Sequence, residues 1–76
     1  MVILTNITKA DNIISATYTP DGYKAPGSVS INTATGEVQK NQSVDDGGGY
    51  WPRAVDILEQ LATRQDTPSE YTYIWY

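Results

Sequence analysis

The stretch YWPRAVDILEQLATR, residues 50–64, decides the fold, because a single amphipathic helix can cover only one face of a sheet. Its apolar side chains recur at intervals of three and four residues, which places them on one stripe of an α-helix. They are Trp51, Ala54, Val55, Leu58, Leu61 and Ala62, with Ile57 widening the stripe. Pro52 suits the first helical turn, where its missing N–H leaves no hydrogen bond unmade. The segment Gln65–Pro68 then ends the helix.

The residues before this helix predict antiparallel strands. Residues 2–8 and 13–19 are rich in β-branched side chains, and they flank Lys9–Asn12, in which Asp and Asn favour a turn. Residues 28–32 alternate strictly between apolar and polar side chains, as a strand does when one of its faces is buried. A hairpin followed by a half-buried strand is typical of an antiparallel sheet.

Three further segments complete the predicted chain path. Gly36 fits the left-handed position of a hairpin loop of three or four residues, so the chain returns as a mostly polar edge strand at residues 37–42. Asp45–Gly49 contains three consecutive glycines and predicts a flexible joint, with its two acids exposed to water. The last residues, 70–76, read EYTYIWY and predict a strand that is apolar or aromatic on both faces.

These segments predict a two-layer α+β fold. An antiparallel sheet of four to five strands carries one helix on one face, in the order β-β-β-β-α-β. The expected core consists of Ile14, Ala16, Tyr18, Val29, Ile31, Val55, Leu58, Leu61, Tyr73 and Trp75. The opposite sheet face is expected to be polar in part, through Ser15, Thr17, Ser28 and Ser30. Ile13, Ile74 and two of the residues Val2, Ile3 and Leu4 have no place in this core, which favours association with a partner.

Composition excludes several classes of protein. The 76 residues contain no Cys and no His, so disulfides, zinc fingers and iron–sulfur sites are excluded. The net charge is -4 and the five Lys and Arg residues are scattered singly, which argues against direct binding of nucleic acid. There is no signal peptide and no apolar run approaching the roughly 20 residues of a membrane span. We therefore expect a cytoplasmic protein that is not bound to membranes.

Candidate chemistry is weak, and we predict that the chain is not an enzyme. Without His or Cys, a Ser or Thr nucleophile would need Lys as its base, and no motif presents such a pair. Asp45 and Asp46 lie beside glycines, where a preorganised acid–base or calcium site is not expected. No catalytic, cofactor-binding or metal-binding residue is therefore predicted.

Several segments carry a resemblance to a group of known proteins. They are YTPDG at residues 18–22, GSVSINTATGE at residues 27–37, the aromatic-led helix with Ala54 and Leu58, and IWY at residues 74–76. In these segments the chain resembles small uncharacterised proteins of Gram-positive bacteria and their prophages. Where those proteins place an aromatic–His pair at the start of the helix, this chain has Trp51–Arg53. The resemblance implies an origin and a fold, and it implies no activity.

The aromatic residues give the strongest indication of function. The chain has six Tyr, two Trp and no Phe, so every aromatic side chain has a polar tip of the kind enriched at interfaces. The candidate interaction surface consists of Tyr23, Tyr50, Tyr71, Ile74 and Tyr76. We expect a non-enzymatic protein-interaction module, such as an accessory protein of a mobile element, that binds another protein or forms a homodimer. Two alternatives remain open: a small carbohydrate- or ligand-binding module, and aromatics that serve only the core and its rim.

Overall fold

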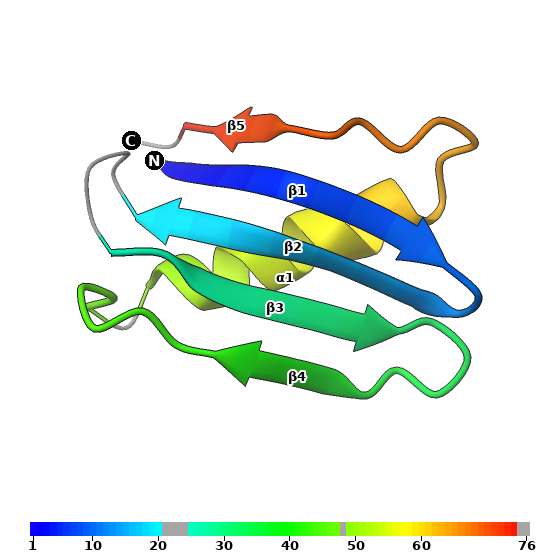
Figure 1. Cartoon of the computed structure of the whole chain (residues 1–76), viewed down its shortest axis with the longest axis horizontal. Coiled ribbons are helices and arrows are strands. Elements are labelled where there is room, and N and C mark those ends of the chain that lie inside the picture. The colour runs from blue at the N-terminus through cyan, green and yellow to red at the C-terminus, as the bar shows by residue number, and fades with distance from the viewer. Residues whose placement is uncertain (21–24, 48, 75–76) are drawn as a thin grey trace.

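A computed structural model describes residues 1–20, 25–47 and 49–74 of the chain. The elements are β1 (Val2–Ala10), β2 (Ile13–Pro20), β3 (Gly27–Asn32), β4 (Val38–Asn41), α1 (Tyr50–Ala62) and β5 (Tyr71–Tyr73). The five strands form one antiparallel sheet in the order β4-β3-β2-β1-β5, and α1 packs on one face of it (Figure 1). The predicted α+β class, layer arrangement and element order are confirmed. The helix ends two residues earlier than predicted.

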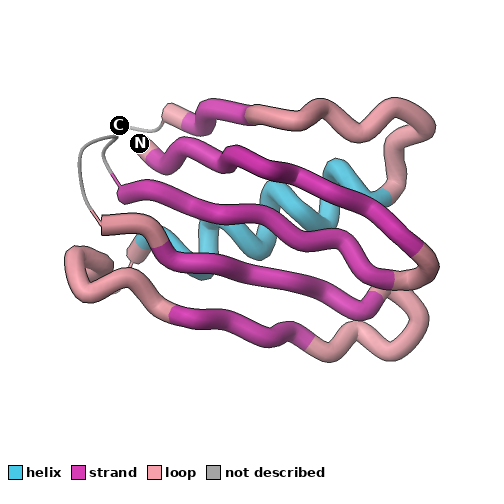
Figure 2. The backbone as a smooth tube through the Cα atoms, viewed as in Figure 1, coloured by secondary structure: helices cyan, strands magenta, loops and turns pink. Residues whose placement is uncertain are grey.

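The tube view shows α1 crossing behind the strands at an angle, so that one layer is the sheet and the other is the helix (Figure 2). The strand that follows the helix does not pair with β4, its nearest strand in sequence. It crosses to the far edge and pairs with β1, with Val2 opposite Tyr73 and Leu4 opposite Tyr71. The predicted edge position of the fourth strand is confirmed, because β4 forms the other edge.

Strand β1 contains a β-bulge that the sequence pattern did not reveal. Thr5 pairs with Thr17 and Thr8 pairs with Ser15, so Asn6 and Ile7 lie opposite a single residue of β2. Asn6 adopts a φ of 52°, in the left-handed region that Asn tolerates better than most residues. The extra residue shifts the alternation of side chains by one position. Ile7 therefore lies on the helix side, where it is buried, and Thr8 lies on the opposite face.

The two hairpins differ in how their turns are built. The first is tighter than predicted, since β1 continues to Ala10 and only Asp11 and Asn12 connect it to β2. In the second, Gly36 has a φ of 79° and donates its N–H to the carbonyl oxygen of Asn32 at 2.7 Å. This is the left-handed position predicted from the sequence, and glycine occupies it without steric strain.

The core lies between α1 and the sheet face that it covers. Of the ten predicted core residues, eight are buried and Tyr73 is half-buried against them, while Trp75 lies outside the described residues. Val2, Leu4 and Ile7 of β1 complete the core, together with Ala54 and Ile57 of the helix. The sequence left the β1 residues unassigned because three consecutive apolar residues do not show which face of a strand is buried.

The segment between β4 and α1 is held by hydrogen bonds around Tyr18. The Tyr18 side chain is fully buried, and its hydroxyl accepts from the Ser43 N–H at 2.9 Å and donates to Asp46 Oδ2 at 2.9 Å. The Asp46 carboxylate also accepts from the N–H groups of Tyr50 and Trp51, at 3.3 and 3.0 Å. These are first-turn donors that the helix itself cannot satisfy, and an acid is favoured at this end of the helix.

Asp45 makes a second connection between distant loops. Its Oδ2 atom accepts from the Ala25 N–H at 2.6 Å, and the Ser43 hydroxyl donates to the Ala25 carbonyl oxygen. The prediction that both acids are exposed to water is confirmed for Asp45, which is exposed although it is hydrogen-bonded, and is wrong for Asp46, which is half-buried. Glycines adjacent in sequence indicated freedom, but the partners of these carboxylates come from residues far away along the chain.

Burial raises the pKa of the Tyr18 hydroxyl above its ordinary value of about 10. The hydrogen bond from the Ser43 N–H opposes this increase, and the Asp46 carboxylate adds to it. Because the folded-state pKa is the higher one, Tyr18 contributes stability that is present below about pH 10. That contribution is lost as the pH rises through the folded-state pKa.

Tyr18→Phe should lower the free energy of unfolding by about 2 kcal/mol, because the buried Ser43 N–H and the Asp46 carboxylate each lose a partner. Denaturant unfolding at neutral pH measures this loss. Tyr71→Phe is the control, since Tyr71 is exposed on β5 and its replacement should change stability by less than about 0.5 kcal/mol. The Tyr18 contribution to the fall in stability above about pH 10 should also disappear. Equal losses in the two variants would contradict a special role for the Tyr18 hydroxyl.

Candidate functional site

The sheet face that points away from α1 is the largest surface that the fold leaves uncovered, and we call it the open face. Its residues pair with one another across the strands and alternate with the buried ones. They are Ile3, Thr5, Thr8, Ala10, Ile13, Ser15, Thr17, Thr19, Ser28, Ser30, Asn32, Gln39, Asn41 and Thr72. Most of these side chains end in a hydroxyl or an amide.

No residue of the open face carries a charge. The five described strands contain two charged residues, Lys9 and Lys40, and both belong to the helix side, since they pair with the buried Ile14 and Val29. Lys9 Nζ donates to the carbonyl oxygen of Ala62 at 2.7 Å, at the helix C-terminus where a cation is favoured. The charges of the strands therefore stabilise the helix layer and leave the open face neutral.

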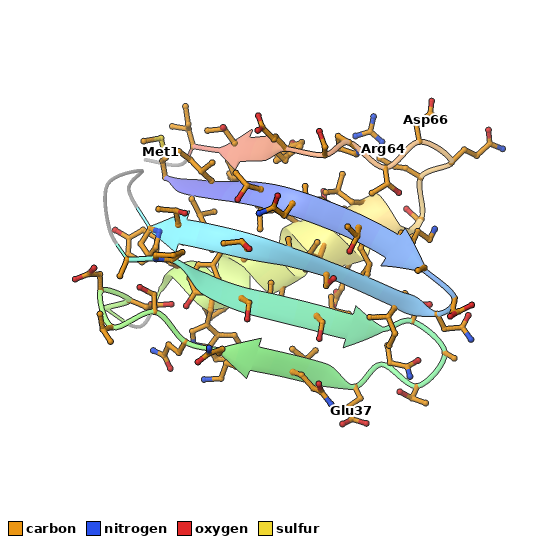
Figure 3. The ribbon with its side chains drawn as sticks, in the orientation of Figure 1. Met1, Glu37, Arg64 and Asp66 are labelled. Carbon is orange, nitrogen blue, oxygen red and sulfur yellow. The ribbon has the colours of Figure 1, made fainter. Side chains whose placement is uncertain are left out.

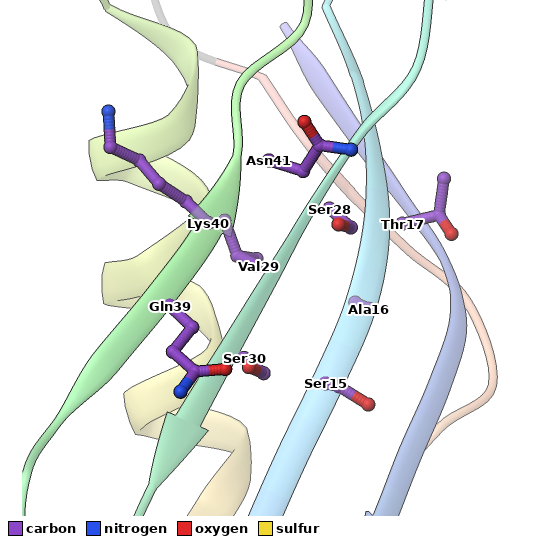
Figure 4. Close-up of a pocket in the computed structure, with 9 residues that line it drawn as sticks. All are labelled: Ser15, Ala16, Thr17, Ser28, Val29, Ser30, Gln39, Lys40 and Asn41. Atoms are coloured by element: carbon purple, nitrogen blue, oxygen red, sulfur yellow. The ribbon is translucent and has the colours of Figure 1, made fainter.

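Lys40, in the edge strand β4, also points away from the open face. Its Nζ atom lies 4.1 Å from the centre of the Trp51 ring, within the range of a cation–π interaction. In Figure 4 its side chain points to the opposite side of β4 from Gln39 and Asn41.

Carboxylates border the open face from outside the strands. Glu37 precedes β4 and lines a hollow with Ser30 and Gln39, Asp11 lies in the turn between β1 and β2, and Glu70 precedes β5. Glu37 extends from the hairpin end of the sheet (Figure 3).

A shallow depression of about 410 Å³ lies on the open face, over β2, β3 and β4. Its rim carries the hydroxyls of Ser15, Thr17, Ser28 and Ser30 and the amides of Gln39 and Asn41 (Figure 4). Ser15 Oγ and Thr8 Oγ1 lie 3.0 Å apart, in hydrogen-bond contact across β1 and β2. Each of these groups can both donate and accept hydrogen bonds, so the surface can bind neutral polar groups.

The structure describes three of the five predicted interaction residues. Tyr50 begins α1 and is half-buried against the core, while Tyr71, 40% exposed, points to the helix side of the edge strand β5. Ile74, 56% exposed, follows the end of that strand. Tyr23 and Tyr76 lie outside the described residues.

The sequence pattern predicted part of the open face. The strict alternation of residues 28–32 assigned Ser28 and Ser30 to it, and Ser15 and Thr17 followed from their place in β2. Gln39 and Asn41 could not be found in this way, because β4 is polar on both faces and alternation then has no direction. Ile3 and Ile13 lie on the same face, and Ile13 is 42% exposed.

Smaller hollows lie beside Glu37, with about 120 Å³, and between α1 and the β3–β4 hairpin, with about 290 Å³. The described residues contain no group of three or more acidic, Cys or His side chains placed to hold a metal ion. Within the same residues, no helix has the length and apolar character needed to cross a membrane. The open face and its depression are therefore the best-defined candidate for binding.

Comparison of the chain with known proteins gives no match to a family model, to a curated protein or to a solved structure. The functional interpretation consequently depends on the residues and their geometry.

Proposed function

We propose that this chain is a non-enzymatic protein-interaction module that binds its partner through the open face of the sheet. The observation that carries the proposal is the distribution of charge: both charged residues of the described strands lie on the helix side, and the open face has none. A binding module of this kind suits an accessory protein of a mobile element, which is the origin that the sequence resemblance implies.

A neutral face is favourable for binding because removing its groups from water costs less free energy than removing charged groups. Removing a charged group from water without a partner is expensive, and the centres of protein interfaces are depleted of charged residues. Hydroxyls and amides can exchange hydrogen bonds with water for hydrogen bonds with a partner. Ser and Thr are also short, so they lose less side-chain entropy on binding than Lys, Glu or Arg.

Apolar side chains on and beside the open face also support a protein partner. Ile3 and Ile13 lie on the open face, and Ile74 follows the strand at its edge. A polar centre with apolar side chains around it provides hydrogen bonds and apolar area in one surface. Protein interfaces commonly combine the two.

A ligand-binding module is the second candidate, and the depression on the open face favours it. Amides and hydroxyls converge there from three strands, as they do in sites for neutral polar ligands such as sugars. However, no aromatic side chain lines the depression to stack on a sugar ring. The protein-partner proposal therefore remains the stronger of the two.

Gln39→Glu tests the proposal by placing one carboxylate on the open face without changing the shape of the side chain. Gln60→Glu is the matched control, because it makes the same substitution at an exposed position of α1. We expect affinity for the partner to fall at least tenfold in Gln39→Glu, since its charge becomes desolvated on binding. The Gln60→Glu variant should bind like the wild type.

The measurement compares proteins retained from the native host by the immobilised wild type and both variants, followed by titration of the retained protein. A glycan array probed with the same three proteins tests the ligand alternative. Equal denaturant midpoints establish that all three proteins are folded. Retention that is unchanged by Gln39→Glu would contradict binding through the open face.

A further inference from the structure

We infer that the partner of the open face is a second copy of this chain, packed sheet against sheet about a two-fold axis. This inference rests on the proposed function, because it assigns an occupant to the same surface. In a two-fold dimer each surface meets itself, so the surface must be complementary to itself. Hydroxyls and amides meet this requirement because each can both donate and accept, whereas a face of like charges cannot.

The charge of the whole chain is compatible with this pairing. Each copy has a net charge of -4, but the charges of the described strands lie on the helix side. Glu37 borders the open face at the end where β4 begins, and the two-fold arrangement described below would place its two copies at opposite ends of the contact. At physiological salt, exposed charges separated by more than about 8 Å are largely screened. Repulsion between two copies is therefore weak at the centre of the contact.

The open face is large enough for a specific but weak dimer. Figure 1 is viewed down the shortest axis of the molecule and shows the sheet face on. The two longer extents of the molecule are 30 and 21 Å. They limit the sheet face to about 600 Å² per copy, so a dimer would bury at most about 1,200 Å² in total, at the lower end of specific interfaces. Interfaces of this size are typically weak, so we expect a reversible dimer.

Two isoleucines of the open face, the exposed Ile13 and the half-buried Ile3, indicate how the two copies are oriented. Ile3 pairs with Thr19 at one end of the open face, and Ile13 pairs with Ala10 at the other end. A two-fold axis that lies between the sheets and runs across the strands reverses the strand direction. It brings Ile3 of one copy over the Ala10–Ile13 end of its partner. Apolar contacts would then form at both ends of the interface, with Thr17 near its centre.

Single cysteines test this arrangement directly, because the chain contains no Cys. Thr17→Cys places a thiol near the centre of the open face, and Gln60→Cys places one on the outer surface of α1. With a short bis-maleimide cross-linker, we expect Thr17→Cys to form covalent dimers at least tenfold more efficiently than Gln60→Cys. Ser28→Cys, at an exposed position paired with Thr17, replaces Thr17→Cys if that variant does not fold.

Sedimentation equilibrium of the wild type and of Gln39→Glu supplies the second measurement. The wild type should be dimeric at high micromolar concentration, and Gln39→Glu should weaken the dimer at least tenfold. A wild type that stays monomeric at millimolar concentration would overturn this inference. The proposed function would remain intact if a different host protein bound to the wild type and did not bind to Gln39→Glu. A dimer cross-linked through Gln60→Cys and unaffected by Gln39→Glu would place self-association on another surface and overturn this inference.

Discussion

Replacing Gly27 by Ala is expected to lower the free energy of unfolding by about 3 kcal/mol. A Cβ atom at this position would lie 2.5 Å from Tyr18 Cε1, 2.6 Å from the Asn41 carbonyl oxygen and 2.7 Å from the Ser43 nitrogen. Two of these three atoms belong to the backbone, so no flexible side chain can move aside. The Tyr18 ring is fully buried and has no room to withdraw. Relief of the overlap therefore requires β3 to separate from its neighbours.

Gly47→Ala is the control for this prediction. Gly47 is exposed, and a Cβ there would meet no atom within 4 Å. Its replacement should change stability by less than about 0.5 kcal/mol. Denaturant midpoints and slopes of both variants measure the difference. If Gly27→Ala unfolds at the same denaturant concentration as Gly47→Ala, the close packing of β2, β3 and β4 around Gly27 is incorrect.

Leu58→Ala should have a comparable effect, a loss of about 3 kcal/mol. Leu58 has no exposed surface and lies in the middle of the buried stripe of α1, so truncation removes apolar contacts and leaves a cavity. A domain of this size has a total stability on the order of 5 to 10 kcal/mol, so the variant would be close to unfolding. Its melting temperature and denaturant midpoint should both fall markedly.

Glu59→Ala provides the comparison on the same helix, because the adjacent side chain is exposed. It should leave stability within about 0.5 kcal/mol of the wild type. If Leu58→Ala lost less than Glu59→Ala, the helix face assigned to the core would be wrong.

Short-range patterns were sufficient to predict the layers of this fold. The apolar spacing along α1, the alternation in β3 and the position of Gly36 each depend on neighbours within a few residues. The bulge at Asn6 and Ile7 could not be predicted, because an extra residue in one strand is recognised only from its pairing with the neighbouring strand. The observed boundaries of α1 and β5 differed from the predicted ones by a few residues, since the ends of helices and strands depend on tertiary contacts.

The open face could be predicted only in part from the sequence. Tyr50 and Tyr71 were selected as amphipathic aromatics, and their part in an interaction stays a prediction, because aromatic content does not show which surface a side chain reaches. The neutrality of the open face depends on where Lys9 and Lys40 point, and this follows from the register of the sheet, including the bulge that moves Lys9 to the helix side. Similarly, the roles of Asp45 and Asp46 depend on partners in other loops. Side-chain direction and long-range pairing were the missing information in each case.

The pairing of β5 with β1 has a consequence for the stability of the sheet edge. β1 pairs with β2 across a two-residue turn, whereas the strand that covers its outer edge, residues 71–73, follows α1 in the chain. When β5 detaches, the start of β1 has an unpaired edge while β2 still holds its other side. Such edges pair readily with other chains. Local opening of β5 is therefore a step at which this protein becomes prone to aggregation.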